Sequence, residues 1–167
     1  IFVCYLPILP RDASMDDDRT EPALDLVGAW AKRCYFAGRA VMDAALRPYD
    51  LGSVQWYVLH RLVEDGPTMQ RDLVRRLDIE RATLSGIVAT LVRKGLVEQE
   101  PDQTDQRQKR LRLTAVGTAL WYELPDLSFI RAAAFGGLDE ADLDTTVRVL
   151  RTATDRLEHL LQRGTRP

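Results

Sequence analysis

The chain is poor in the residues on which disulfide frameworks, zinc sites and low-complexity segments depend. Its 167 residues include two cysteines, two histidines, eight prolines and ten glycines, and aromatic side chains make up 7%. Two cysteines cannot build a disulfide framework, and two histidines leave little for a zinc site. No apolar run approaches the roughly 20 residues that span a bilayer. We therefore expect a cytoplasmic protein with no cofactor and no membrane partner.

The common signatures of enzyme sites are also missing. His60 and His159 fall in different predicted helices, so a nucleophile–histidine–carboxylate site would need a coincidence of folding. The chain has neither a phosphate-binding P-loop nor the G-x-G-x-x-G pattern of dinucleotide sites. Its carboxylates fall mainly at predicted helix caps and exposed helix positions. These absences predict a protein that is not an enzyme.

Charge is nearly balanced overall but unevenly distributed. The formal net charge is −2, and 46% of the residues are apolar, which suits one globular domain or a small module with helices shared with a partner. Residues 53–114 carry eleven basic and nine acidic side chains, whereas the segments on either side are each net acidic. This mild positive bias favours a nucleic-acid contact only in combination with the motifs below.

The first segment of the chain, residues 1–20, is predicted to be an N-terminal extension. Its first ten residues are apolar, but Pro7 and Pro10 interrupt them and no basic segment precedes them. They are therefore a poor match to a signal peptide. Met15, which three aspartates follow, would be a natural first residue. We accordingly expect residues 1–14 to be foreign to the native chain.

Long helices are predicted on both sides of the middle segment, and the first and last of them carry apolar seams. In segment 21–52 a helix runs to about Leu46. Segment 115–163 holds a helix that Thr114 caps, which runs to about Phe135 and bends near Pro125, and another helix over 139–162. The seam of the first helix consists of Leu24, Val27, Ala31, Cys34, Gly38, Val41 and Ala45. That of the last consists of Leu143, Val147, Leu150, Thr154, Leu157 and Leu161. Steps of three and four are typical of helices that pack on helices, so we predict that these segments form a homodimer.

Between them, residues 53–114 are predicted to form a winged helix-turn-helix. Periodicity indicates helices over 53–63, about 69–77 and 80–94, and Gly95 ends the last of them. Two strands, 97–100 and 110–114, then form a hairpin around a polar tip. In this arrangement the second helix of the motif lies in the major groove and the hairpin flanks it. The predicted fold is therefore mainly α, with a two-stranded β wing.

The exposed face of the 80–94 helix is predicted to contact DNA. Leu84, Ile87, Val88 and Leu91 share one face, and the opposite face carries small side chains that permit close approach to base edges. Arg81 can reach a guanine edge or a phosphate, and Ser85 can donate to either. The predicted contacts on this helix are Arg81, Thr83, Ser85, Gly86, Thr90 and Arg93. Small residues on a merely solvated helix surface are the alternative interpretation.

The hairpin is predicted to add Asp105, Arg107 and Lys109 to the DNA contacts. An arginine at a hairpin tip suits the negative potential of a narrow minor groove, and Asp105 can orient its guanidinium. The alternative is a solvated surface ion pair. Asp105-Gln-Arg107, followed after five residues by Leu113-Thr114, resembles the D-x-R-x5-L-T pattern of the MarR (multiple-antibiotic-resistance regulator) family.

Further motifs extend this resemblance over roughly residues 22–163. The segments 55–59 (QWYVL), 81–85 (RATLS) and 94–97 (KGLV) are similar to the family's motifs. The resemblance implies a homodimeric regulator, most often a repressor, that binds a pseudo-palindromic operator on double-stranded DNA and is released by a small molecule or an oxidant. Glu80 departs from the serine that the family often has there, which puts the sequence preference in doubt. A winged-helix interaction module without operator binding is the alternative.

The resemblance also places an effector where the first, second and fifth helices meet the DNA-binding lobe. A phenolic or aromatic carboxylate could stack there, with Arg39 or His60 meeting its charge. The predicted pocket residues are Trp30, Cys34, Tyr35, Arg39, Trp56, Tyr57, His60 and Trp121. Ordinary core packing of these aromatic residues is one alternative. Redox sensing by Cys34, close to basic side chains, is another.

Overall fold

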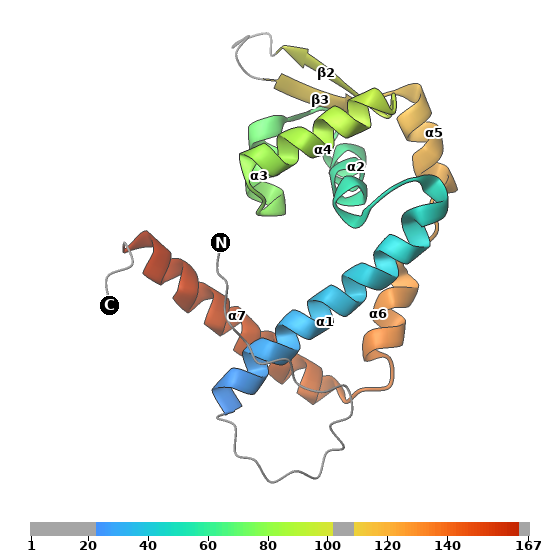
Figure 1. The fold of residues 1–167 in the computed structure, drawn as a ribbon. Coiled ribbons are helices and arrows are strands. Elements are labelled where there is room, and N and C mark those ends of the chain that lie inside the picture. Colours follow the sequence, from blue (N-terminus) through green and yellow to red (C-terminus); the bar gives the residue numbers. More distant parts are fainter. Residues whose placement is uncertain (1–22, 102–108, 164–167) are drawn as a thin grey trace. The chain divides into compact units, whose positions relative to one another are not determined.

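A computed structural model describes residues 23–101 and 109–163. The predicted extension 1–20 and the predicted wing-tip residues Asp105 and Arg107 lie outside the described residues. The chain divides into two compact units, residues 1–127 and 128–167. Figure 1 shows both units as ribbons. In the described part of the chain, no helix is both long and apolar enough to cross a membrane.

The first unit contains the predicted order of helices and strands. Its helices are α1 (Ala23–Leu46), the 3-10 helix η1 (Arg47–Tyr49), α2 (Ser53–Asp65), α3 (Gln70–Leu77), α4 (Arg81–Arg93) and α5 (Ala115–Glu123). Its strands are β1 (Thr68–Met69), β2 (Val97–Pro101) and β3 (Lys109–Leu113). α3 and α4 form the helix-turn-helix, and β2 and β3 lie beside α4 (Figure 1). The prediction of a mainly helical winged fold is confirmed.

Leucine and valine side chains from every part of the winged helix meet in one core. The 3.6-residue periodicity correctly predicted the inner face of α4, where Leu84, Val88 and Leu91 are buried. The other fully enclosed side chains of this core include Leu46, Val58, Leu59, Leu73, Val97 and Leu111. Burying each of them stabilises the fold by about 1.5–3 kcal/mol relative to exposure. The core therefore holds α4 so that its other face stays open to solvent.

The wing is part of a three-stranded antiparallel sheet in the order β1-β3-β2. The predicted hairpin is present, and in it Val97 pairs with Leu113 and Glu100 with Arg110. The strand β1 adds to it, with Thr68 opposite Leu111. Two residues have no alternating pattern to read, so this strand could not be predicted. Leu111 is fully buried, whereas Leu113 is half-buried.

Side chains from distant segments fix the ends of α2 and α4. Asp43 of α1 accepts a hydrogen bond from the Ser53 backbone N–H at 2.6 Å, which places a carboxylate at the positive end of α2. At the other end of the motif, Lys94 caps α4 and pairs with Asp50, 2.9 Å from Nζ to Oδ2. Asp50 itself has a positive φ of 54°, which an aspartate tolerates better than most residues. These contacts connect the end of α1 with both α2 and α4.

The helix predicted from Thr114 to Phe135 is in fact two helices. Thr114 caps α5 as predicted, because its side chain accepts from the Gly117 N–H at 2.9 Å. However, α5 ends at Glu123, and α6 begins only at Ser128 and continues to Phe135. Leu124, directly before Pro125, is extended with ψ at 145°. A residue before proline avoids the helical region, so the helix ends here instead of continuing with a bend.

The second unit consists of α6 and α7 (Glu140–Gln162), and neither helix buries a side chain fully. Asp139, predicted as the first residue of this helix, is its cap, since its carboxylate accepts from the backbone N–H groups of Ala141 and Asp142. The predicted apolar seam of α7 is largely exposed. Its exposed members are Val147, Leu150, Thr154, Leu157 and Leu161. An apolar helix face of this length needs a packing partner.

Candidate nucleic-acid interface

The outer face of α4 carries the side chains predicted to contact DNA. Exposed residues on this helix include Arg81, Thr83, Ser85, Gly86 and Arg93. Thr90 is half-buried, and its hydroxyl donates to the Gly86 carbonyl at 3.0 Å while it accepts from Arg93 Nη2 at 3.4 Å. Thr90 therefore orients Arg93 at the helix end. Glu80 precedes the first turn, and its side chain makes no capping hydrogen bond.

A hollow of about 430 Å³ lies between the start of α3, the start of α4 and the beginning of β3. Its lining residues are Met69, Gln70, Arg71, Val74, Arg81, Ser85 and Lys109. Three of them are cations, and Arg71 also lies 3.8 Å from Asp72, measured from Nε to Oδ1. Arg71 was not among the predicted contacts, although its place beside the helix-turn-helix start could have suggested it. The hollow brings predicted residues of α4 and of the wing to one concave surface.

A chain of four hydrogen bonds crosses this surface from the wing to the recognition helix. Lys109 Nζ donates to Gln99 Oε1 at 3.3 Å, and Gln99 Nε2 donates to Gln70 Oε1 at 3.0 Å. Gln70 Nε2 then donates to Ser85 Oγ at 3.0 Å, and Ser85 Oγ donates to the Arg81 carbonyl at 2.9 Å. Sequence reasoning missed both glutamines, because residues 29 positions apart that meet through folding leave no local pattern.

Four of the eight predicted pocket residues come together in an aromatic cluster on α2 and α5. Trp56 stacks on His60 with ring centroids 4.7 Å apart, and Trp121 lies 5.4 Å from Trp56 and 5.6 Å from His60. Tyr57 meets the Trp56 ring edge-on at 5.3 Å. Trp56, His60 and Trp121 are each half-buried, so the cluster keeps access to solvent. Glu64 lies 3.4 Å from His60 Nε2.

The other four predicted pocket residues, Trp30, Cys34, Tyr35 and Arg39, lie exposed on α1. Their contacts are with near neighbours in the helix. The Arg33 guanidinium lies over Trp30 at 5.2 Å, Tyr35 meets Phe36 edge-on, and Arg39 pairs with Asp43 at 3.8 Å, from Nε to Oδ2. Cys34 is a free thiol. These four residues form no cluster with the aromatic rings of α2 and α5 among the contacts that the structure describes.

Comparison with known proteins agrees with this architecture. The model of the MarR family matches residues 49–108, a range that contains α2, the helix-turn-helix and β2. The chain is 27% identical over 151 residues to the HTH-type transcriptional repressor NicR of Pseudomonas putida, covering 90% of this chain and 95% of NicR.

Solved structures share the fold. A MarR variant from E. coli complexed with operator DNA has a TM-score of 0.70 at 20% identity and covers 78% of this chain and 95% of its own. BpsR of Bordetella bronchiseptica, whose DNA binding is regulated by 6-hydroxynicotinic acid, has a TM-score of 0.67 at 28% identity. It covers 77% of this chain and 98% of its own.

The fold and the exposed helix face define a winged helix-turn-helix protein. Its winged helix-turn-helix region matches the MarR family of transcriptional regulators over residues 49–108, and the relatives above are regulators of this kind, which confirms the resemblance found in its motifs. The family and these relatives are regulators rather than enzymes, as the sequence predicted.

Proposed function

We propose that this protein is a homodimeric repressor that binds a pseudo-palindromic operator through α4 and the wing. The observation that carries the proposal is the concave surface beside α4, where Arg71, Arg81 and Lys109 border one hollow next to the exposed, small-residue helix face. Such a surface fits a major groove and the phosphates along its edge. Repression is favoured because a dimer that occupies a promoter blocks polymerase without further contacts.

Within this proposal, each DNA-contacting residue has a role. Arg81 and Ser85 face base edges, Thr83 and Gly86 lie on the rest of the exposed surface of α4, and Thr90 holds Arg93 toward the DNA backbone. Lys109 stands at the base of the wing. From the sequence motif alone, we assign Arg107 to the minor groove and Asp105 to its orientation.

Arg81→Gln is expected to weaken operator binding by about 1–3 kcal/mol, because it removes a cation that faces the groove. The measurement is a titration of the chain on the DNA upstream of its own gene at several salt concentrations. The wild type should show a steep linear fall of log affinity with log salt, with a slope of about −0.9 for each phosphate contacted.

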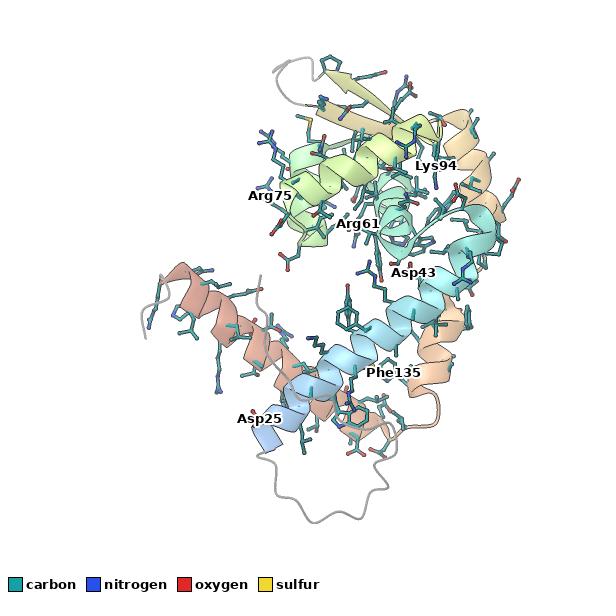
Figure 2. All side chains as sticks on the ribbon, viewed as in Figure 1. Asp25, Asp43, Arg61, Arg75, Lys94 and Phe135 are labelled. Carbon is teal, nitrogen blue, oxygen red and sulfur yellow. The ribbon has the colours of Figure 1, made fainter. Side chains whose placement is uncertain are left out.

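Arg75→Gln supplies the matched control for Arg81→Gln. Arg75 is a cation on α3, labelled in Figure 2, that pairs with Asp72 and does not line the hollow. Its substitution should leave affinity nearly unchanged. A wild-type protein with little or no salt dependence would contradict operator binding and favour a winged-helix interaction module.

The proposal of a homodimer is supported by the apolar helix faces that each unit leaves exposed. In α7 this face is the heptad seam, and in α1 it includes Val27, Trp30 and Val41. Large apolar side chains exposed at heptad spacing are typical of helices that pack against a second chain. Two chains also suit two operator half-sites that lie about one turn of the DNA double helix apart.

We further propose that an aromatic carboxylate regulates DNA binding from the Trp56–His60–Trp121 cluster. Half-buried indole rings offer faces for stacking, and an imidazole beside them can meet a carboxylate. The regulation of BpsR by 6-hydroxynicotinic acid supports this class of ligand. Trp30, Cys34, Tyr35 and Arg39 remain candidate contributors from α1.

Trp121→Leu should weaken binding of 6-hydroxynicotinic acid by up to about tenfold, since an aromatic pair contributes about 0.5–1.5 kcal/mol. Binding is measured through quenching of tryptophan fluorescence and through release of labelled operator. Tyr122→Leu is the control, because Tyr122 follows Trp121 on α5 and its side chain is 84% exposed. Equal loss in both variants, or no quenching in the wild type, would contradict the assignment of the ligand to this cluster.

A further inference from the structure

The hydroxyl group of Ser85 is already committed in the free protein. A serine hydroxyl has one hydrogen to donate and two lone pairs that accept. The hydrogen is used toward the Arg81 carbonyl at 2.9 Å, and one lone pair is used by Gln70 Nε2 at 3.0 Å. What remains is one lone pair on an exposed side chain of the recognition helix. The prediction that Ser85 donates to a base or phosphate therefore conflicts with the bonds it makes.

The donors and acceptors in the hydrogen-bond chain that reaches Ser85 are set at its other end, by Lys109. An amide side chain can present either its oxygen or its nitrogen to a neighbour, but the ammonium group of Lys109 can only donate. Gln99 must therefore turn its oxygen to Lys109 and its nitrogen to Gln70. Gln70 must then turn its oxygen to Gln99 and its nitrogen to Ser85. Lys109, at the start of β3, thus makes Gln70 donate to Ser85, while the Arg81 carbonyl, which can only accept, takes the serine hydrogen.

We propose that Ser85 accepts a hydrogen bond from an exocyclic amino group in the major groove, either N6 of adenine or N4 of cytosine. These two groups are the donors that bases present there, whereas guanine O6 and N7 and thymine O4 are acceptors. Lys109, Gln99 and Gln70 are positioning residues that direct the remaining lone pair of Ser85 without touching the base. The inference rests on the proposed operator binding and adds to it a base class at one position of each half-site.

The first test is a selection from a randomised duplex library, read by sequencing, with the wild type and Ser85→Ala. The wild type should prefer adenine or cytosine at one position of each half-site by about three- to tenfold, the usual range for one neutral hydrogen bond. Ser85→Ala should lose that preference at that position only. Replacing the selected adenine by purine, or the cytosine by pyrimidin-2-one, removes the amino group and should weaken the wild type but not Ser85→Ala.

The second test removes the group that sets the direction. Lys109→Met should relax the adenine-or-cytosine preference at the same position, because both amides can then turn and Gln70 no longer fixes the direction of the lone pair that Ser85 has left. Lys109→Arg, which still only donates, should retain it. Arg112→Met is the matched control: Arg112 lies on the same strand, pairs with Glu98 and Glu100, and stands outside the hydrogen-bond chain. It should leave the preference unchanged.

The outcomes separate this inference from the proposed function. A wild type that enriches no sequence, with affinity independent of salt, would contradict operator binding itself. A wild type that binds specifically but prefers guanine or thymine at the Ser85-dependent position would overturn only the acceptor role of Ser85. Identical preferences in Lys109→Met and Arg112→Met would overturn the role of Lys109.

Discussion

Replacing Gly117 by alanine is expected to lower the free energy of unfolding by about 3 kcal/mol, because the added methyl group meets backbone that cannot move aside. A Cβ at this position would lie 2.0 Å from the Leu96 carbonyl oxygen and 2.9 Å from its carbonyl carbon. The same stretch is fixed to α5 by Thr114, whose N–H donates to the Leu96 carbonyl at 3.1 Å and whose hydroxyl donates to the Gly95 carbonyl. The substitution must push α5 off the start of β2.

The sign of this effect is informative because helix propensity predicts the opposite. Alanine is better than glycine inside a helix by about 1 kcal/mol. Gly28→Ala in α1, where an added Cβ would meet nothing within 4 Å, should therefore stabilise the protein slightly. Both variants are compared by urea unfolding at one protomer concentration, since a dimer unfolds in a concentration-dependent way. A Gly117→Ala protein as stable as the wild type would contradict the close approach.

Local patterns predicted the features that depend on one segment alone. The inner face of α4 followed from apolar residues at a spacing of three and four, and the cap Thr114 followed from its residue type. The hairpin followed from alternation between Val97 and Leu113. In each case the residues that determine the feature lie close together in the sequence, within one helix or one hairpin.

Features that depend on distant segments could not be predicted in this way. The strand β1 exists because Thr68 and Met69 pair with β3, some 40 positions further along the chain. Gln70 and Gln99 become part of the candidate DNA surface only because the same sheet brings them together. The break after α5 was locally readable, but the proline was weighed as a bend, and the extended Leu124 shows that its effect on the preceding residue decided the outcome.

The candidate effector site shows the same division. The aromatic residues of α2 and α5 were expected to gather, and Trp56, His60 and Trp121 do so. Composition could not decide whether α1 joins them, because a helix rich in apolar residues suits a ligand pocket and a subunit interface equally well. Trp30 and Tyr35, each about 60% exposed, are as compatible with contact to a second chain as with a ligand.

The largest effect is expected from charging the seam of α7. Leu157 and Leu161 are 62% and 70% exposed and lie on one face of the helix. In the proposed dimer each buried leucine contributes about 2 kcal/mol, so the four leucines of two chains contribute about 8 kcal/mol. Leu157→Glu combined with Leu161→Glu removes this contribution and adds four carboxylates to the interface. A loss of this size weakens dimerisation by roughly a millionfold.

We therefore expect the double variant to sediment with the mass of one chain at concentrations where the wild type has the mass of two. Its operator affinity should fall to that of a single half-site, because two recognition helices no longer bind as one unit. Thr152→Glu adds a carboxylate on the opposite side of the same helix and should leave both properties unchanged. If the double variant instead stays dimeric and binds DNA normally, the seam of α7 is not the interface, and the exposed face of α1 would have to hold the dimer alone.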